Sequence, residues 1–186
     1  MHEDIFKKRL IEQAQLKPGM HLLDVGCGTG TLAMMIKRAY PQVEVNGLDG
    51  DLQVINIARQ KAAQAELDIT LDLGMAYSLP YQENHFERVV SSMMMHHLNR
   101  ERKIQTLQEV HRVLRMGGEF HLVDFGPPSN IYTRLGSILM EKIEEVEDNI
   151  NGNMVTFIRS AGFTSVTETG QFDTFAGTLV FYKAIK

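Results

Sequence analysis

The stretch LLDVGCGTG, residues 22–30, places an aspartate and three alternate glycines directly after a short apolar run. Glycine allows backbone angles closed to other residues and lets a ligand approach the main chain without a Cβ in the way. A helical pattern follows, so we expect free backbone N–H groups at its start to point into a crevice. A plain strand-to-helix turn would need only one or two glycines. Asp24, Gly26, Gly28 and Gly30 therefore predict a ligand-binding loop.

The spacing of these glycines bears on which ligand the loop binds. A dinucleotide-binding loop has the pattern G-x-G-x-x-G, and its third glycine would fall at Thr31. The third glycine here is Gly30, one residue earlier. The spacing argues against a pyrophosphate and leaves a nicotinamide-dependent oxidoreductase as the less favoured alternative.

Apolar runs with strand character alternate with segments of helical spacing along the chain, which is typical of a parallel sheet wrapped by helices. The helical sets are Leu32, Met35, Ile36 and Ala39; Ile55, Ala58, Ala62 and Ala65; and Ile104, Leu107, His111 and Leu114. We expect the third strand at an edge and the first and fourth in the centre, with a closing antiparallel hairpin. The strands are predicted near residues 20–25, 43–48, 67–73, 86–92, 118–124, 164–170 and 176–184.

Length and composition limit the possible functions. The 186 residues, 44% hydrophobic and 23% charged, suit a single domain spanning 1–186. A formal net charge of −4 without a basic cluster argues against nucleic-acid binding. Cys27 is the only cysteine, so neither a disulfide nor a thiolate zinc site is expected and no metal is implied. No apolar run approaches the length of a membrane span, and we expect a soluble, cytoplasmic protein.

Five further stretches show what the loop resembles: VEVNGLDGD, LGMAYSLPYQENHFERVVSSMMMHHL, LQEVHRVLRMGGEFHLVDFG, VTFIRSAGFTSV and AGTLVFYKAIK. In this order, and with LLDVGCGTG, they resemble the class I S-adenosylmethionine-dependent methyltransferases of the ubiquinone/menaquinone-biosynthesis type. The resemblance implies an α/β fold with a Rossmann-like, doubly wound sheet of seven strands, mostly parallel with an antiparallel last strand, and helices on both faces. It also implies S-adenosyl-L-methionine as cofactor and S-adenosyl-L-homocysteine as product.

The resemblance assigns cofactor contacts residue by residue. The glycine loop would hold the methionine half, and Asp49 would accept hydrogen bonds from the ribose hydroxyls. Asp51 is expected to cap the following helix. The full set of expected cofactor-binding residues is Asp24, Gly26, Cys27, Gly28, Gly30, Asp49, Gly50, Met75, Ala76 and Ser91.

Two of these positions depart from the family pattern. Met75 stands where the family usually has an aspartate beside the adenine amino group, and Gly50 stands where it has a bulky apolar residue. A thioether accepts hydrogen bonds only weakly but packs well on a ring, and the N–H of Ala76 remains for the adenine. We expect retained binding in an altered adenine pocket. A module that binds the cofactor or its product without turnover is the alternative.

Methyl transfer from a sulfonium needs a nucleophile held in line with the S–CH₃ bond and shielded from water. Candidates near the strand ends are His97, His96 and Asp124, with His97 ranked first as a general base. An equally good interpretation of the histidine pair is that it shapes the pocket. The methionines at 93–95 fit either an apolar acceptor site or core packing.

The acceptor site is expected to be covered by helices. Residues 1–17 predict an N-terminal helix, and residues 129–150 predict a helical lid whose amphipathic part runs from about 131 to 147. A second helix after it should end at Gly162. The acceptor is expected to be a small, apolar or aromatic molecule methylated at carbon, oxygen or nitrogen, and the sequence predicts no oligomeric state.

Overall fold

A central sheet organises the computed structural model, which describes residues 3–134 and 145–186. Its seven strands lie in the order β3-β2-β1-β4-β5-β7-β6. The strands are β1 (His21–Val25), β2 (Glu44–Asp49), β3 (Thr70–Leu73), β4 (Phe86–Ser92), β5 (Leu114–Phe125), β6 (Ser165–Thr174) and β7 (Gly177–Ile185). The predicted doubly wound, seven-stranded fold class is confirmed.

The directions of the strands predict a crevice at the carboxyl ends of the parallel strands. β1 pairs in parallel with β2 on one side and with β4 on the other, so the order of the strands reverses beside β1. In open α/β sheets, ligands bind outside the carboxyl ends of the strands at such a point. β3 lies at the edge, as predicted, and β7 runs antiparallel to both of its neighbours, β5 and β6.

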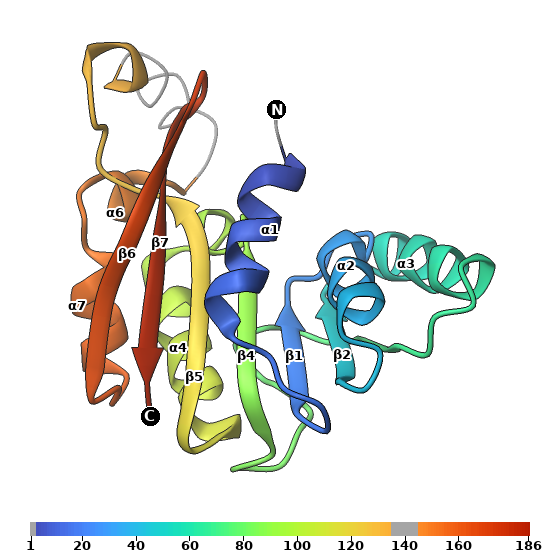
Figure 1. Ribbon diagram of the computed structural model, residues 1–186. Coiled ribbons are helices and arrows are strands. Elements are labelled where there is room, and N and C mark those ends of the chain that lie inside the picture. Colours follow the sequence, from blue (N-terminus) through green and yellow to red (C-terminus); the bar gives the residue numbers. More distant parts are fainter. Residues whose placement is uncertain (1–2, 135–144) are drawn as a thin grey trace.

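Helices cover both faces of this sheet (Figure 1). One face carries α1 (Glu3–Ala14), α2 (Thr31–Ala39) and α3 (Leu52–Gln64), and the other carries α4 (Arg100–Val113) and α7 (Met154–Ser160). Two shorter elements are η1 (Met95–His97), a 3₁₀ turn after β4, and α6 (Glu147–Ile150). The helix after residue 153 is as predicted, with Gly162 following it in a left-handed conformation at φ +106°.

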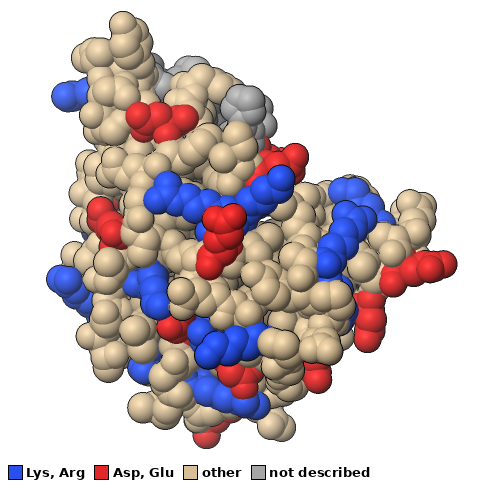
Figure 2. All heavy atoms as spheres, viewed as in Figure 1, with Lys and Arg blue, Asp and Glu red and all other residues tan. Residues whose placement is uncertain are grey.

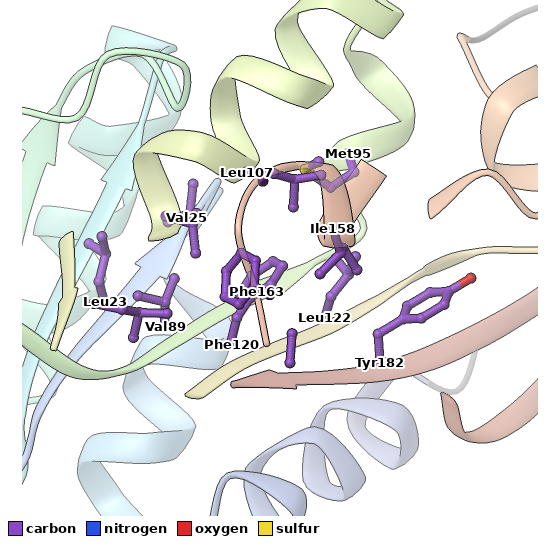
Figure 3. Close-up of a cluster of buried hydrophobic side chains, with 14 of the residues drawn as sticks. Leu23, Val25, Val89, Met95, Leu107, Phe120, Leu122, Ile158, Phe163 and Tyr182 are labelled. Atoms are coloured by element: carbon purple, nitrogen blue, oxygen red, sulfur yellow. The ribbon is translucent and has the colours of Figure 1, made fainter. Parts of the chain in front are cut away.

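The core between the sheet and the second face fixes where the crevice lies (Figure 3). Leu23 and Val25 of β1 lie in this layer with Met95 of η1 and with Leu107 and Ile158 from the two covering helices. Each of these side chains is almost fully buried. Close packing of this kind leaves few voids into which side chains could move. The ends of β1 and β4 are therefore held in a fixed position relative to η1.

The structure corrects the prediction for the fourth helix. α4 ends at Val113, and Leu114 already belongs to β5, which therefore begins four residues earlier than predicted. The buried face of α4 is also displaced by about one residue, because Lys103 and Thr106 are buried while Ile104 is only partly so. The Lys103 Nζ donates to the carbonyl oxygen of Glu145, which is how a lysine is accommodated there.

The predicted lid is only partly within the described residues. Residues 131–134 are helical, residues 135–144 lie outside the described part, and Val146 precedes the separate helix α6. The N-terminal helix is observed as α1.

Lysine and arginine side chains are interspersed with aspartates and glutamates over the face shown in Figure 2. None of the helices in the described ranges is long and apolar enough to cross a membrane.

Candidate functional site

The glycine loop after β1 takes its shape from left-handed backbone angles. Gly26, Gly28 and Gly30 have φ values of +71°, +57° and +77°, which residues with a Cβ rarely adopt. At Gly26 a Cβ would also lie 2.2 Å from Cγ of Met94, so the close packing of the loop against the turn after β4 requires a glycine. At Gly28 nothing lies within 4 Å of the same position. The loop is therefore packed tightly on one side and open beside Gly28.

The expectation that the loop presents free N–H groups is wrong for four of its residues. The N–H groups of Gly26 and Cys27 donate to the carbonyl oxygen of Leu48, at 2.8 and 3.0 Å. The N–H of Gly30 donates to the carbonyl oxygen of Cys27, and that of Gly28 donates to the carboxylate of Asp49. The pattern of residue types does not show this, because three of the four N–H groups donate to residues of the neighbouring strand β2.

Asp24, at the end of β1, is fully buried beneath the loop. One of its carboxylate oxygens, Oδ2, accepts no hydrogen bond. Burial raises the pKa of Asp24 to about 7; Lys7 of α1 and a hydrogen bond from the N–H of Ala33 lower it, while Asp49 raises it. A buried carboxylate oxygen without a donor is costly, so Asp24 is suited to a cationic or hydrogen-bond-donating group. The partly compensating Lys7 could not be recognised from the sequence.

Asp49 ends β2 and faces the loop. Its Oδ2 accepts the N–H of Gly28 at 2.9 Å, and its Oδ1 accepts the N–H of Asp51 at 3.0 Å. An ionised carboxylate has about four lone-pair directions, so two remain for a ligand. Asp51 caps α3 as predicted, accepting the N–H groups of Gln53 and Val54. Asp51 therefore has the task expected of it, whereas the ribose contact expected of Asp49 stays a prediction.

A cavity of about 220 Å³ lies where the carboxyl ends of β1 to β4 meet. Six of the predicted site residues line it, and Leu48, Gly74, Tyr77, Met94 and Leu98 complete the lining. Leu48 lies at the end of β2 and the other four lie in the segments after β3 and β4, so the rule that sites gather at strand ends could have indicated them. The predicted residues in the lining are Gly26, Asp49, Gly50, Met75, Ala76 and His97.

The two departures from the family pattern fit one another. A Cβ at Gly50 would lie 2.9 Å from Sδ of Met75, so the thioether occupies space that a larger residue at position 50 would fill. Met75 lies at the rim of the cavity with 47% of its surface exposed. The sequence showed two unusual residues, whereas the structure shows a complementary pair.

Asp124 lies behind the cavity and does not line it. Its Oδ2 accepts the N–H groups of Met94 and Met95, and its Oδ1 accepts from Phe125 N–H and lies 2.7 Å from Nδ1 of His96. Burial alone would raise the pKa of Asp124, but His96 and the N–H donors hold that pKa below its usual range. Asn149 of α6 adds a further donor, its Nδ2, at 3.3 Å. Asp124 therefore fixes the turn that carries the histidine pair.

The two histidines have different surroundings. His96 is 4% exposed and packed against Phe125, whereas His97 is exposed and lines the cavity, with the two imidazole centroids 4.1 Å apart. Of the candidates for proton transfer, His97 is the one that reaches the cavity. Among the methionines of the run, Met94 lines the cavity and Met95 is in the core.

Two other expected contacts are engaged inside the protein. The Ser91 Oγ is buried and donates to the carbonyl oxygen of Val25 at 2.8 Å. The Cys27 side chain packs with Ile55 and Ala58 of α3, and burial raises the pKa of its thiol. Within the described ranges, no group of three or more His, Cys, Asp and Glu side chains is placed to hold a metal ion.

Comparisons with known proteins agree on one class of protein. Residues 22–118 match the model of a family described as "Methyltransferase domain". A demethylmenaquinone methyltransferase of Symbiobacterium thermophilum is 33% identical over 69% of this chain and 52% of its own length, so the chain spans about half of that relative. An uncharacterized methyltransferase of Synechocystis is 31% identical over 88% of this chain and 76% of its own length.

A solved structure shows the same fold. Phosphoethanolamine N-methyltransferase 2 of Haemonchus contortus, in complex with S-adenosyl-L-methionine, superposes with a TM-score of 0.78 over 98% of this chain and 52% of that one, at 15% identity.

Proposed function

The chain belongs to the methyltransferase domain family, and from this membership we propose that it binds S-adenosylmethionine and transfers the methyl group to a small acceptor. The resemblance of its motifs to that family is thereby confirmed. The observation that carries the proposal is the cavity at the ends of β1 to β4, which brings the glycine loop, Asp49 and His97 together.

The residues present fit the cofactor. Asp49 keeps two lone-pair directions for the ribose hydroxyls, and such bonds to a carboxylate are charge-assisted. Because Gly26 has no side chain, its main chain packs directly against Met94, and the lining of the cavity is narrow there. In the solved relative of the same fold, the ligand is S-adenosyl-L-methionine.

When bound, the cofactor supplies an electrophilic methyl carbon and a thioether leaving group. The chain has to exclude water and hold the acceptor so that its lone pair lies in line with the S–CH₃ bond. Loss of the methyl group would convert the cofactor to S-adenosylhomocysteine. An acceptor that must lose a proton would lose it to a base at the cavity.

We assign His97 as that base, with His96 and Asp124 as positioning residues. His97 is the imidazole that lines the cavity, and the ring of His96 lies against it. His96 is in turn held by Asp124, which also anchors the peptide groups of the turn. The proton taken up by His97 would leave to solvent, because this side chain is exposed.

The acceptor we propose is apolar or aromatic. Met94 and Leu98 form the apolar side of the cavity next to His97. The relative from Symbiobacterium is named for an acceptor of that kind, demethylmenaquinone.

We further propose that residues 1–186 act as one domain in the cytoplasm, where a lone thiol such as that of Cys27 stays reduced. α1 belongs to this domain because Phe6 and Leu10 are buried against the sheet.

Isothermal titration with S-adenosylhomocysteine tests the first half of the proposal. We expect micromolar binding by the wild type, a loss of at least tenfold for Asp49→Ala, and unchanged binding for Asp68→Ala, an exposed acid outside the cavity. Absence of binding to both S-adenosylhomocysteine and S-adenosylmethionine would refute the cofactor.

The second half is tested by label from methyl-tritiated S-adenosylmethionine, counted in the organic phase after incubation with small hydroquinones, phenols and amines. We expect transfer to at least one of these, and a rate for His97→Ala that falls more than the affinity for S-adenosylhomocysteine does. Binding of S-adenosylhomocysteine without transfer to any of them would instead favour the non-catalytic binding module.

A further inference from the structure

The end of the cavity formed after β2 and β3 lacks a carboxylate or amide side chain that could accept a hydrogen bond from an amino group. Its lining there consists of Gly50, Gly74, Met75, Ala76 and Tyr77. None of these carries a carboxylate or an amide. The carboxylate and the imidazole of the lining belong to Asp49 and His97, which lie at the ribose and acceptor ends under the proposed function.

Met75 covers this end in place of a side chain at position 50. A Cβ at residue 50 would lie 2.9 Å from Sδ of Met75, and about half of Met75 is exposed to solvent. A thioether is polarisable and adapts its three torsions, so it packs on a flat ring, but it is a poor acceptor of hydrogen bonds. A ring held here is therefore contacted by dispersion, next to an opening towards solvent.

Besides the Tyr77 hydroxyl, the polar groups available at this end are backbone carbonyl oxygens and peptide N–H groups. The N–H of Gly74 donates to the carbonyl oxygen of Asp49. Those of Met75, Ala76 and Tyr77 donate to no acceptor among residues 3–134 and 145–186. An N–H group is a donor, so it can bind a ring nitrogen with a lone pair but not an amino group. The Tyr77 ring is fixed beneath the guanidinium of Arg102, 4.6 Å from its centroid.

We propose that this subsite holds the purine of the methyl donor without reading the exocyclic amino group, so that donors alkylated at that nitrogen bind as well as S-adenosylmethionine. Met75 is then a specificity-determining residue, and it makes the site permissive. The inference rests on the proposed function, because it takes the nucleoside end of the cofactor to lie against residues 74–77. Substituents on the amino nitrogen would extend past the half-exposed thioether into solvent.

The test compares S-adenosylhomocysteine with its N6,N6-dimethyl derivative, which has no N–H on the exocyclic nitrogen. By isothermal titration we expect the wild type to bind the two with dissociation constants within about threefold of each other. Met75→Asp places a carboxylate at the rim, which accepts from the amino group of the parent compound and is left unpaired by the derivative. We expect this variant to prefer the parent by at least tenfold.

The control is Met116→Asp, the same substitution at a methionine that is 80% exposed and lies outside the cavity. We expect its preference to equal that of the wild type. A wild type that binds S-adenosylhomocysteine but rejects the dimethyl derivative by tenfold or more overturns the inference and leaves the proposed function standing. Equal preference of Met75→Asp and wild type also overturns it. If the wild type binds neither compound, the proposed function itself fails.

Discussion

Replacing Asp24 by asparagine should change how the stability of the protein depends on pH. In the folded protein the pKa of Asp24 is raised to about 7 by burial, whereas in an unfolded chain it has its ordinary value of 3.8. Between these two values the folded protein keeps a proton that the unfolded chain releases. The stability contributed by this carboxyl group is therefore fully present below about pH 4 and is lost as the pH rises through about 7.

The size of the effect follows from the difference of about 3 pKa units, at 1.36 kcal/mol per unit, which amounts to about 4 kcal/mol. Roughly two of these units fall between pH 5 and 7. The free energy of unfolding of Asp24→Asn minus that of the wild type should thus rise by about 3 kcal/mol over this range and then level off. The charged neighbours that set the value are Lys7 and Asp49, which both variants retain.

Urea unfolding followed by circular dichroism at pH 5, 6, 7 and 8 measures this difference. Titrating groups that do not interact with Asp24 contribute equally to both proteins and cancel. Asp68→Asn, at an exposed position, should stay within about 0.5 kcal/mol of the wild type at every pH. A difference between Asp24→Asn and wild type that is flat within about 0.5 kcal/mol from pH 5 to 8 would refute the assignment of a protonated Asp24.

Three further substitutions test the loop and its supports. Gly26→Ala should lower the free energy of unfolding by about 2 kcal/mol or more because its Cβ would overlap Met94. The control is Gly19→Ala, at φ +79° with nothing within 4 Å, which should cost only about 1 kcal/mol of backbone strain. Equal losses of the two variants in thermal melts would contradict the overlap. Asp51→Ala should cost about 1 kcal/mol through loss of the α3 cap, measured by urea unfolding, and no loss would argue against the cap. Ser91→Ala should cost about 1 kcal/mol and change the affinity for S-adenosylhomocysteine by less than threefold; a tenfold loss of affinity would return Ser91 to the cofactor site.

The positions of three strands in the sheet could be predicted because the apolar patterns carry that information, whereas the full strand order was not predicted. The alternation in β3 marked an edge strand, and the uninterrupted runs of β1 and β4 marked central ones. The start of β5 was misplaced because Leu114 continues the helical spacing of α4, so periodicity alone could not separate the two elements.

The residues of the site were found more readily than their contacts. Asp49 and His97 sit where strand ends were expected, and both line the cavity. The pairing of loop N–H groups with Leu48 and the burial of Asp124 arise from contacts across strands, which local spacing does not encode. The fit between Gly50 and Met75 likewise depends on distance in space, so the sequence showed two exceptions where the structure shows one arrangement.

Because Asp124 anchors η1, the residues that hold the methyl donor and those that fix the histidine turn come from different halves of the chain. Everything proposed to hold the donor precedes residue 78, while the carboxylate and amide that fix the histidine turn come from β5 and α6. Descendants of this chain could therefore acquire new acceptors through changes late in the sequence, with the machinery for the methyl donor inherited intact.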